Sequence, residues 1–119
     1  RRHKFVGIYN KALSDLPLEI PYQHPDCFSA FHLYPIRLHM TKLKKGREAI
    51  FNEMRSNGVG VNVHYIPVHT QPYYKSLGFR EGDFPVSEQY YFDCLTIPLH
   101  PNLNEKQIDK VLKSLCAIK

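Results

Sequence analysis

Residues 58–74, with the sequence GVGVNVHYIPVHTQPYY, contain the side chains of this chain that are best suited to bind a ligand. Two histidines, His64 and His69, lie on either side of a proline, and the same stretch supplies phenol groups at Tyr65, Tyr73 and Tyr74. Imidazole and phenol groups that line a cleft can donate hydrogen bonds to phosphates, carboxylates and sugar hydroxyls. The stretch is therefore the candidate binding site, although a histidine on a strand is often structural and paired tyrosines can simply cover the edge of a core.

The first half of this stretch has the pattern of a strand. Valines and a tyrosine recur at every second residue from 59 to 65, and Gly60, Asn62 and His64 fall between them. That alternation predicts a strand with one buried face and one polar face that meets a ligand or another domain. Because Pro67 lacks a backbone donor, it ends the ladder, and we expect a loop after it with His69 outside the core.

Helices and strands alternate along the rest of the chain. Apolar residues at i, i+3 and i+4 spacing predict helices at residues 5–16, 46–57 and 105–115, and Pro85 predicts the start of a short helix at 85–93. Shorter apolar patterns predict strands at 31–40 and 95–99. Gly58 ends the second helix, Pro85 begins the third, and a capping box formed by Asn104 and Gln107 precedes the last. These elements predict an α+β fold, with one sheet of about three or four strands and helices packed on one face.

Length and composition exclude several protein classes. At 119 residues the chain is long enough for one domain with an ordinary core. Its 43% apolar and 23% charged residues are typical of a soluble globular protein. The chain has no apolar run of about 20 residues and no signal-peptide pattern, so we expect no membrane partner. Three cysteines, without metal or redox spacing, favour a reducing compartment such as the cytoplasm.

Two other kinds of function stay open from the residues alone. A metal-binding domain would use the two histidines of residues 58–74 and a third ligand from among His32, His39 and His100. No helical i, i+4 pair and no neighbouring cysteine prearranges such a site, so we expect no metal. A small basic module for RNA or DNA would use the net charge of +5, but the aromatic residues cluster instead of alternating with Lys and Arg, so we expect no nucleic-acid partner. The sequence also lacks a nucleophile elbow, an HExxH motif and a phosphate-binding loop.

Four blocks of the sequence resemble the C-terminal part of one enzyme family. The blocks are SxFHLYPIRL at 29–38, GVGVNVHYIPVHTQPYY at 58–74, GDFPVSEQ at 82–89 and LTIPLHPNLNEKQIDKVLKSL at 95–115. Their order and spacing are similar to those of the DegT/DnrJ/EryC1/StrS aminotransferases, and the match covers nearly the whole chain. Within that family the sequence looks most like the enzymes that make the 4-amino sugar on the route to pseudaminic acid.

The resemblance implies a function. Such enzymes are fold-type I aminotransferases that use pyridoxal 5'-phosphate to aminate keto groups of nucleotide-linked sugars, usually with glutamate as the amino donor, in the biosynthesis of surface polysaccharides and other glycans. Residues 1–119 would be their small C-terminal domain, which has a short, mostly antiparallel sheet. The full-length protein is expected to be a homodimer in which this domain packs against its own N-terminal large domain.

The resemblance also implies what this chain lacks. In the family, the Schiff-base lysine and the groups that hold the cofactor come from the large domain, and no lysine of this chain matches that motif. We therefore expect no catalytic and no cofactor-binding residue here, and no activity from the chain alone. The absence of an initiator methionine, together with a helical pattern that has already begun at Phe5, is likewise expected of a piece of a longer protein.

The residues expected to contact the substrate also follow from the resemblance. The HYxPxH segment, which includes His64, Tyr65 and His69, lies near bound substrate in the family, because the small domain closes one side of the active-site cleft. We expect substrate contacts from His69 first and then from His64, Tyr65 and Tyr74. Their division among sugar, phosphate and amino donor is left open.

Overall fold

The computed structural model describes residues 1–118 and contains helices, 3-10 turns and three strands; Lys119, the last residue of the expected domain, lies outside the described residues. The elements are α1 (Arg2–Leu13), β1 (Leu18–Glu19), β2 (Tyr34–Leu38), η1 (Met40–Lys42), α2 (Arg47–Ser56), η2 (Val68–Thr70), α3 (Pro72–Ser76), α4 (Pro85–Asp93), β3 (Cys94–Ile97) and α5 (Glu105–Cys116). No helix within residues 1–118 has both the length and the apolar character needed to cross a bilayer.

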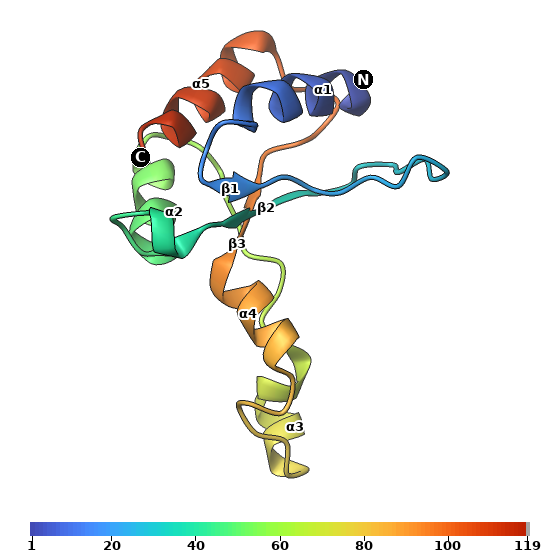
Figure 1. Cartoon of the computed structure of the whole chain (residues 1–119), viewed down its shortest axis with the longest axis vertical. Helices are drawn as coiled ribbons and strands as arrows, with labels where there is room; N and C mark the ends of the chain where they lie inside the picture. Colours follow the sequence, from blue (N-terminus) through green and yellow to red (C-terminus); the bar gives the residue numbers. More distant parts are fainter. Residues whose placement is uncertain (119) are drawn as a thin grey trace.

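The sheet is antiparallel and has the order β1-β2-β3 (Figure 1). Leu18 pairs with Leu38, and Ile36 pairs with Leu95, so the central strand is β2. Alternate residues of β2 are buried, as period-two geometry requires of a strand with one core-facing side. The predicted α+β class and antiparallel sheet are confirmed.

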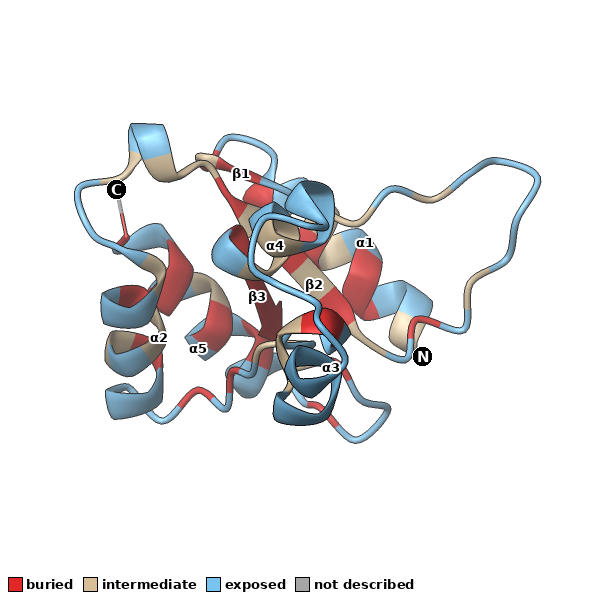
Figure 2. Ribbon diagram, turned by 90° about the horizontal axis from the view of Figure 1, so that it is seen from below, coloured by how far each residue is buried: buried red, intermediate tan, exposed pale blue. Residues whose placement is uncertain are grey.

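Helices α1, α2 and α5 supply much of the rest of the core. Figure 2 shows the buried residues gathered around the sheet and along the inner sides of these helices. Tyr9 of α1 and Tyr34 of β2 are both fully buried, and their hydroxyl groups donate to the Pro98 carbonyl at 2.8 Å and to Asn10 Oδ1 at 2.5 Å. A buried phenol needs such a partner because an unpaired hydroxyl costs about 1–3 kcal/mol. Burial raises the pKa of both tyrosines, so they stay neutral.

Local helix signals in the sequence were reliable. Helix α4 has the predicted bounds, α5 extends one residue beyond its predicted end, and α2 is one residue shorter than predicted at each end. Both hydrogen bonds of the capping box are present: the Gln107 N–H donates to Asn104 Oδ1, and the Asn104 N–H donates to Gln107 Oε1. Helix α1 is the exception, because it ends at Leu13 rather than at residue 16. Pro17 disfavours helical geometry in the residue before it, and the chain turns earlier to enter β1.

The strand predicted over residues 59–65 is wrong. This segment forms only one isolated bridge, in which Asn62 and Thr96 exchange two backbone hydrogen bonds of 3.1 and 2.8 Å. The Asn62 side-chain carbonyl then accepts the Val63 N–H at 2.8 Å, which removes the next donor from any ladder. The peptide bond between His64 and Tyr65 is cis. The valines at 59 and 61 are buried as expected, but Tyr65 is 70% exposed, so the buried face ends before it.

Residues 66–93 form an arm that projects from the body of the molecule (Figure 1). The loop expected after Pro67 is ordered secondary structure: η2 is followed by the short helix α3, with Pro72 at its first position. Proline is favoured there because its fixed φ suits a helix and its missing N–H has no helical partner. The arm folds back through α4, which leads directly into β3. The candidate binding residues therefore lie on a folded projection and at its root.

Candidate functional site

His69 is held inside the arm by a glutamate from another element. Its Nε2 lies 2.7 Å from Oε1 of Glu88, which comes from the first turn of α4. The ring also packs against Phe84, with 4.8 Å between ring centroids. His69 is only 7% exposed, so the expectation that it lies outside the core is wrong. The reason is that α4 folds back over η2 and covers the turn that carries the histidine.

Glu88 is also the hydrogen-bond acceptor for the turn that precedes α4. The backbone N–H of Gly82 donates to both carboxylate oxygens at 2.8 and 3.0 Å, and the N–H of Phe84 donates to Oε1 at 3.4 Å. The Gly82 N–H and then His69 lower the pKa of Glu88, since both favour the charged form. Glu88 is therefore a carboxylate at neutral pH.

A shallow hollow of about 310 Å³ lies beside this pair. It is lined by Val68, His69, Tyr74, Phe79, Phe84 and Ser87. The walls are mostly aromatic, and an imidazole and a hydroxyl supply the polar groups. Such a recess suits the apolar face of a ring compound whose polar substituents reach one or two fixed hydrogen-bonding groups.

His64 belongs to a separate network at the root of the arm. Its Nδ1 lies 3.0 Å from Thr96 Oγ1, and its Nε2 lies 3.3 Å from Asn62 Nδ2. Since Asn62 Oδ1 accepts the Val63 N–H, its Nδ2 must be the donor toward His64. His64 Nε2 therefore accepts, and Nδ1 carries the hydrogen that points to Thr96. Both ring nitrogens are engaged.

The predicted site residues thus fall into two groups. His69 and Tyr74 line the same hollow. His64 packs edge-to-face against Tyr65, with 4.6 Å between ring centroids, beside β3. No hydrogen bond or ring contact within residues 1–118 joins the two groups. Sequence reasoning missed Glu88, because a glutamate in the first turn of a helix that begins at Pro85 shows no sign of a contact with a histidine 19 residues earlier.

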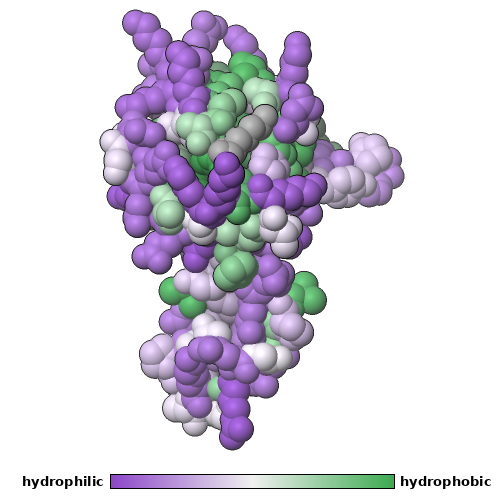
Figure 3. Space-filling model, turned by 60° about the vertical axis from the view of Figure 1, so that its left-hand side comes forward, coloured by the Kyte–Doolittle hydropathy of each residue, from purple (hydrophilic) through white to green (hydrophobic). Residues whose placement is uncertain are grey.

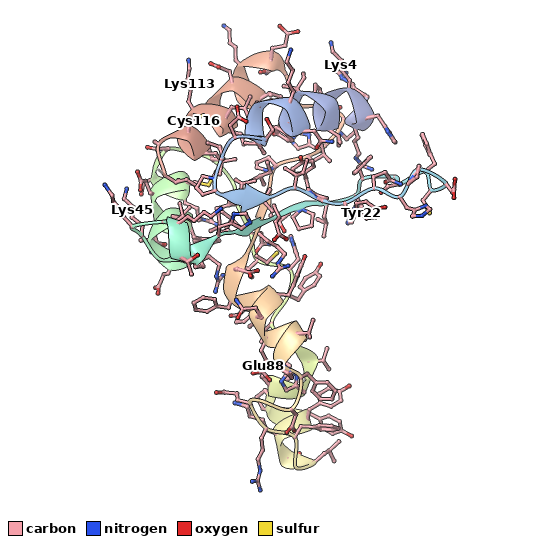
Figure 4. All side chains as sticks on the ribbon, in the orientation of Figure 1. Lys4, Tyr22, Lys45, Glu88, Lys113 and Cys116 are labelled. Atoms are coloured by element: carbon pink, nitrogen blue, oxygen red, sulfur yellow. The ribbon has the colours of Figure 1, made fainter. Side chains whose placement is uncertain are left out.

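The lysines of the described chain do not suit a Schiff-base cofactor. Every lysine among residues 1–118 is exposed, and Lys4, Lys45 and Lys113 point away from the body (Figure 4). A lysine that attacks a carbonyl needs a shielded site or a neighbouring cation that lowers its amine pKa. The described residues therefore do not fit covalent attachment of pyridoxal phosphate. Nor do residues 1–118 bring three His, Cys, Asp or Glu side chains together in a way that could hold a metal ion.

A family comparison covers nearly the whole chain. Residues 1–116 match the model of the DegT/DnrJ/EryC1/StrS aminotransferase family. The chain belongs to this family. The resemblance seen in the sequence is thereby confirmed.

Individual proteins and solved structures are also similar to this chain. The spore coat polysaccharide biosynthesis protein SpsC of Bacillus subtilis (strain 168) is 34% identical over 97% of this chain and 30% of its own length. The crystal structure of DesV from S. venezuelae is 27% identical, covers 96% of this chain and 30% of DesV, and superposes with a TM-score of 0.84. Helicobacter pylori PseC, an aminotransferase involved in the biosynthesis of pseudoaminic acid, is 25% identical over 98% of this chain and 31% of PseC, with a TM-score of 0.81. The chain spans about 30% of the length of these relatives.

Proposed function

We propose that this chain is the C-terminal small domain of a pyridoxal-phosphate-dependent aminotransferase. The complete enzyme would transfer an amino group from glutamate to a keto group of a nucleotide-linked sugar, in the biosynthesis of a surface polysaccharide or another glycan. The family assignment supports the reaction class, and the names of SpsC and PseC support polysaccharide and amino-sugar biosynthesis as the setting. The free cysteines Cys27, Cys94 and Cys116 are in keeping with a cytoplasmic enzyme.

The cofactor would be held by a large domain outside this chain. Every lysine within residues 1–118 is exposed, which supports the proposal that the Schiff-base lysine lies in the large domain. On this proposal the small domain contributes no bond-forming group. Its own residues bind the substrate, orient it and close one side of the cleft.

The arm offers a surface for that large domain, within a homodimer of the complete enzyme. Its exposed apolar side chains include Ile66, Val68, Tyr73, Leu77, Val86 and Phe92, of which Val86 is 84% exposed. Figure 3 shows hydrophobic residues at the surface where the arm leaves the body. Monomeric proteins rarely leave such residues grouped on one projection, so we propose that the large domain covers part of this surface.

The substrate contacts proposed for this domain are His69, His64, Tyr65 and Tyr74. The observation that carries the proposal is the hollow in which His69 and Tyr74 lie together. A fixed imidazole and a phenol beside aromatic walls can hydrogen-bond the polar substituents of a nucleotide sugar while its rings pack on the walls. His64 and Tyr65 would contribute from the root of the arm.

The proposal is tested on the complete protein that carries this domain. Supplied with pyridoxal phosphate, L-glutamate and a UDP-linked 4-keto sugar, it should yield the amino sugar, detected by mass spectrometry. Tyr74→Ala should lower kcat/KM roughly tenfold, because one hydrogen bond or ring contact to the substrate is worth about 1.4 kcal/mol. Tyr22→Ala is the control, since this ring is 83% exposed, lies outside the arm and does not line the hollow. Equal losses in the two variants would remove the hollow from the substrate site, and the absence of product from every nucleotide-linked keto sugar tried would reject the reaction.

A further inference from the structure

We infer that Glu88 is a positioning residue: it binds Nε2 of His69, so that the imidazole presents Nδ1 to the substrate. This inference rests on the proposed function, and it names the atom and the supporting residue that the function would require. His69 and Glu88 come from different elements, η2 and α4, so the arrangement exists only when the arm is folded.

The protonation of His69 Nε2 follows from the chemistry of the Glu88 carboxylate. A carboxylate can only accept hydrogen bonds, and Oε1 lies 2.7 Å from Nε2. Nε2 must therefore carry a hydrogen whether the ring is neutral or protonated. The carboxylate is itself fixed by the N–H groups of Gly82 and Phe84, which also lower the pKa of Glu88 and keep it charged. The ring cannot exchange its two nitrogens without breaking this contact.

Nδ1 is the nitrogen that remains available. Among residues 1–118 it has no hydrogen-bond partner, and the fully buried side-chain nitrogens without a partner in that range are Arg2 Nε and His39 Nδ1. Nδ1 of His69 therefore keeps contact with solvent, although the residue as a whole is buried. The ring lines the hollow with Tyr74 and packs against Phe84, which limits its rotation.

The two predicted site histidines differ in the number of ring nitrogens that already have a protein partner. His64 has both nitrogens engaged, by Asn62 and Thr96, and can meet a substrate only through its ring edge or face. Within residues 1–118, His69 retains one nitrogen without a protein partner, and this nitrogen can accept a hydrogen bond from a hydroxyl or an ammonium group when the ring is neutral. When the ring is protonated, the same nitrogen donates to a phosphate or a carboxylate. Of the two histidines, His69 is therefore the one that can hydrogen-bond a substrate without first losing a protein partner.

The nitrogen assignment is tested by NMR on the ¹⁵N-labelled chain. At a pH where the ring is neutral, the two-bond ¹H–¹⁵N pattern of His69 should show hydrogen on Nε2 and none on Nδ1. The Nε2–H proton should exchange slowly with water, and Glu88→Ala should abolish that protection. A hydrogen on Nδ1, or an Nε2–H that is equally protected without Glu88, would overturn the inference.

The inference that Nδ1 of His69 contacts the substrate is tested by two substitutions in the complete enzyme, assayed with L-glutamate and a UDP-linked 4-keto sugar. The amide of His69→Asn reaches the place of Nδ1, whereas the longer amide of His69→Gln reaches the place of Nε2. His69→Gln should keep the thermal stability and lose roughly tenfold or more in kcat/KM. His69→Asn should lose stability and keep kcat/KM per folded molecule within about threefold. Equal losses, or the reverse pattern, would overturn the inference.

The role of Glu88 is tested by rescue in the same assay. Glu88→Ala should lower kcat/KM per folded molecule, and Glu88→Gln should restore most of it, since an amide oxygen can still accept the Nε2–H. An unchanged kcat/KM in folded Glu88→Ala would make Glu88 purely structural. Absence of activity in the wild-type complete protein would instead reject the proposed function, and the NMR experiment on the chain still decides the nitrogen assignment.

Discussion

Arg37 in β2 and Asp93 at the end of α4 form a bidentate ion pair that connects the arm to the sheet. Arg37 Nε lies 3.0 Å from Asp93 Oδ1, and Nη2 lies 2.9 Å from Oδ2. The Asp93 side chain is 6% exposed and that of Arg37 is 39% exposed, so solvent screens one side of the pair. Gln89 also donates to Asp93 Oδ2 at 3.3 Å. This paired geometry fixes the direction in which α4 leaves the body.

The first prediction concerns that pair. Asp93→Ala should lower the free energy of unfolding by about 1–3 kcal/mol, because it removes a buried, charge-assisted acceptor and leaves Arg37 with only a surface partner. Urea unfolding measures the change. Glu19→Ala is the control, since Glu19 contacts the same guanidinium at 3.2 Å but is largely exposed. Glu19→Ala should lower the free energy of unfolding by no more than about 0.5 kcal/mol. Equal losses of unfolding free energy in Asp93→Ala and Glu19→Ala would show that the bidentate geometry adds no stability.

The second prediction concerns the end of α2. Gly58 has φ +69°, and the N–H groups of Gly58 and Val59 donate to the carbonyls of Arg55 and Met54, which is the Schellman pattern. Gly58→Ala should lower the free energy of unfolding by about 1–2 kcal/mol, since a Cβ is disfavoured at positive φ. Gly60→Ala is a suitable control because its added Cβ meets nothing within 4 Å and its φ is not positive. A stable Gly58→Ala with unchanged Tm would contradict the argument.

The third prediction is the response of the arm to acid. The pKa of Glu88 is lower in the folded chain than in the unfolded chain, so its hydrogen bonds stabilise the fold at neutral pH and are lost as the pH falls below the ordinary value of 4.5. The difference in unfolding free energy between wild type and Glu88→Gln should therefore shrink from pH 7 to about pH 3. Urea unfolding at several pH values measures it. A difference that stays constant over this range would show that the charge of Glu88 has no part in stability.

The fourth prediction concerns the cofactor. Because every lysine within residues 1–118 is exposed, pyridoxal phosphate added to the chain alone, followed by borohydride, should label several lysines weakly and without saturation. Peptide mass spectrometry locates the label. The complete enzyme, treated in parallel, should give one saturable adduct on a lysine outside this chain. A one-to-one adduct on a single lysine of residues 1–118 would overturn the assignment of the cofactor to another domain.

Several features of the fold could be predicted from the sequence because they depend on neighbours in the chain. Helix α4 begins at Pro85 and α5 begins after Asn104, as proline geometry and a capping box dictate within one helical turn. The period-two burial of β2 follows from its apolar alternation. The family resemblance is equally a property of the sequence, since it depends on the types and spacing of residues in four blocks.

Tertiary structure decided where the candidate site residues lie. The alternation of residues 59–65 predicted a strand, but pairing needs a partner edge, and only Asn62 meets one, at Thr96. His69 was expected in a loop, yet Glu88 buries it from a helix 19 residues further along the chain. Local propensity contains no information about contacts of that range, because they form only when distant elements pack together. On the proposed function, the sequence determined which side chains could bind a substrate. Within residues 1–118, the packing of α4 over η2 decided that Nε2 of His69 binds Glu88 and that Nδ1 has no protein partner.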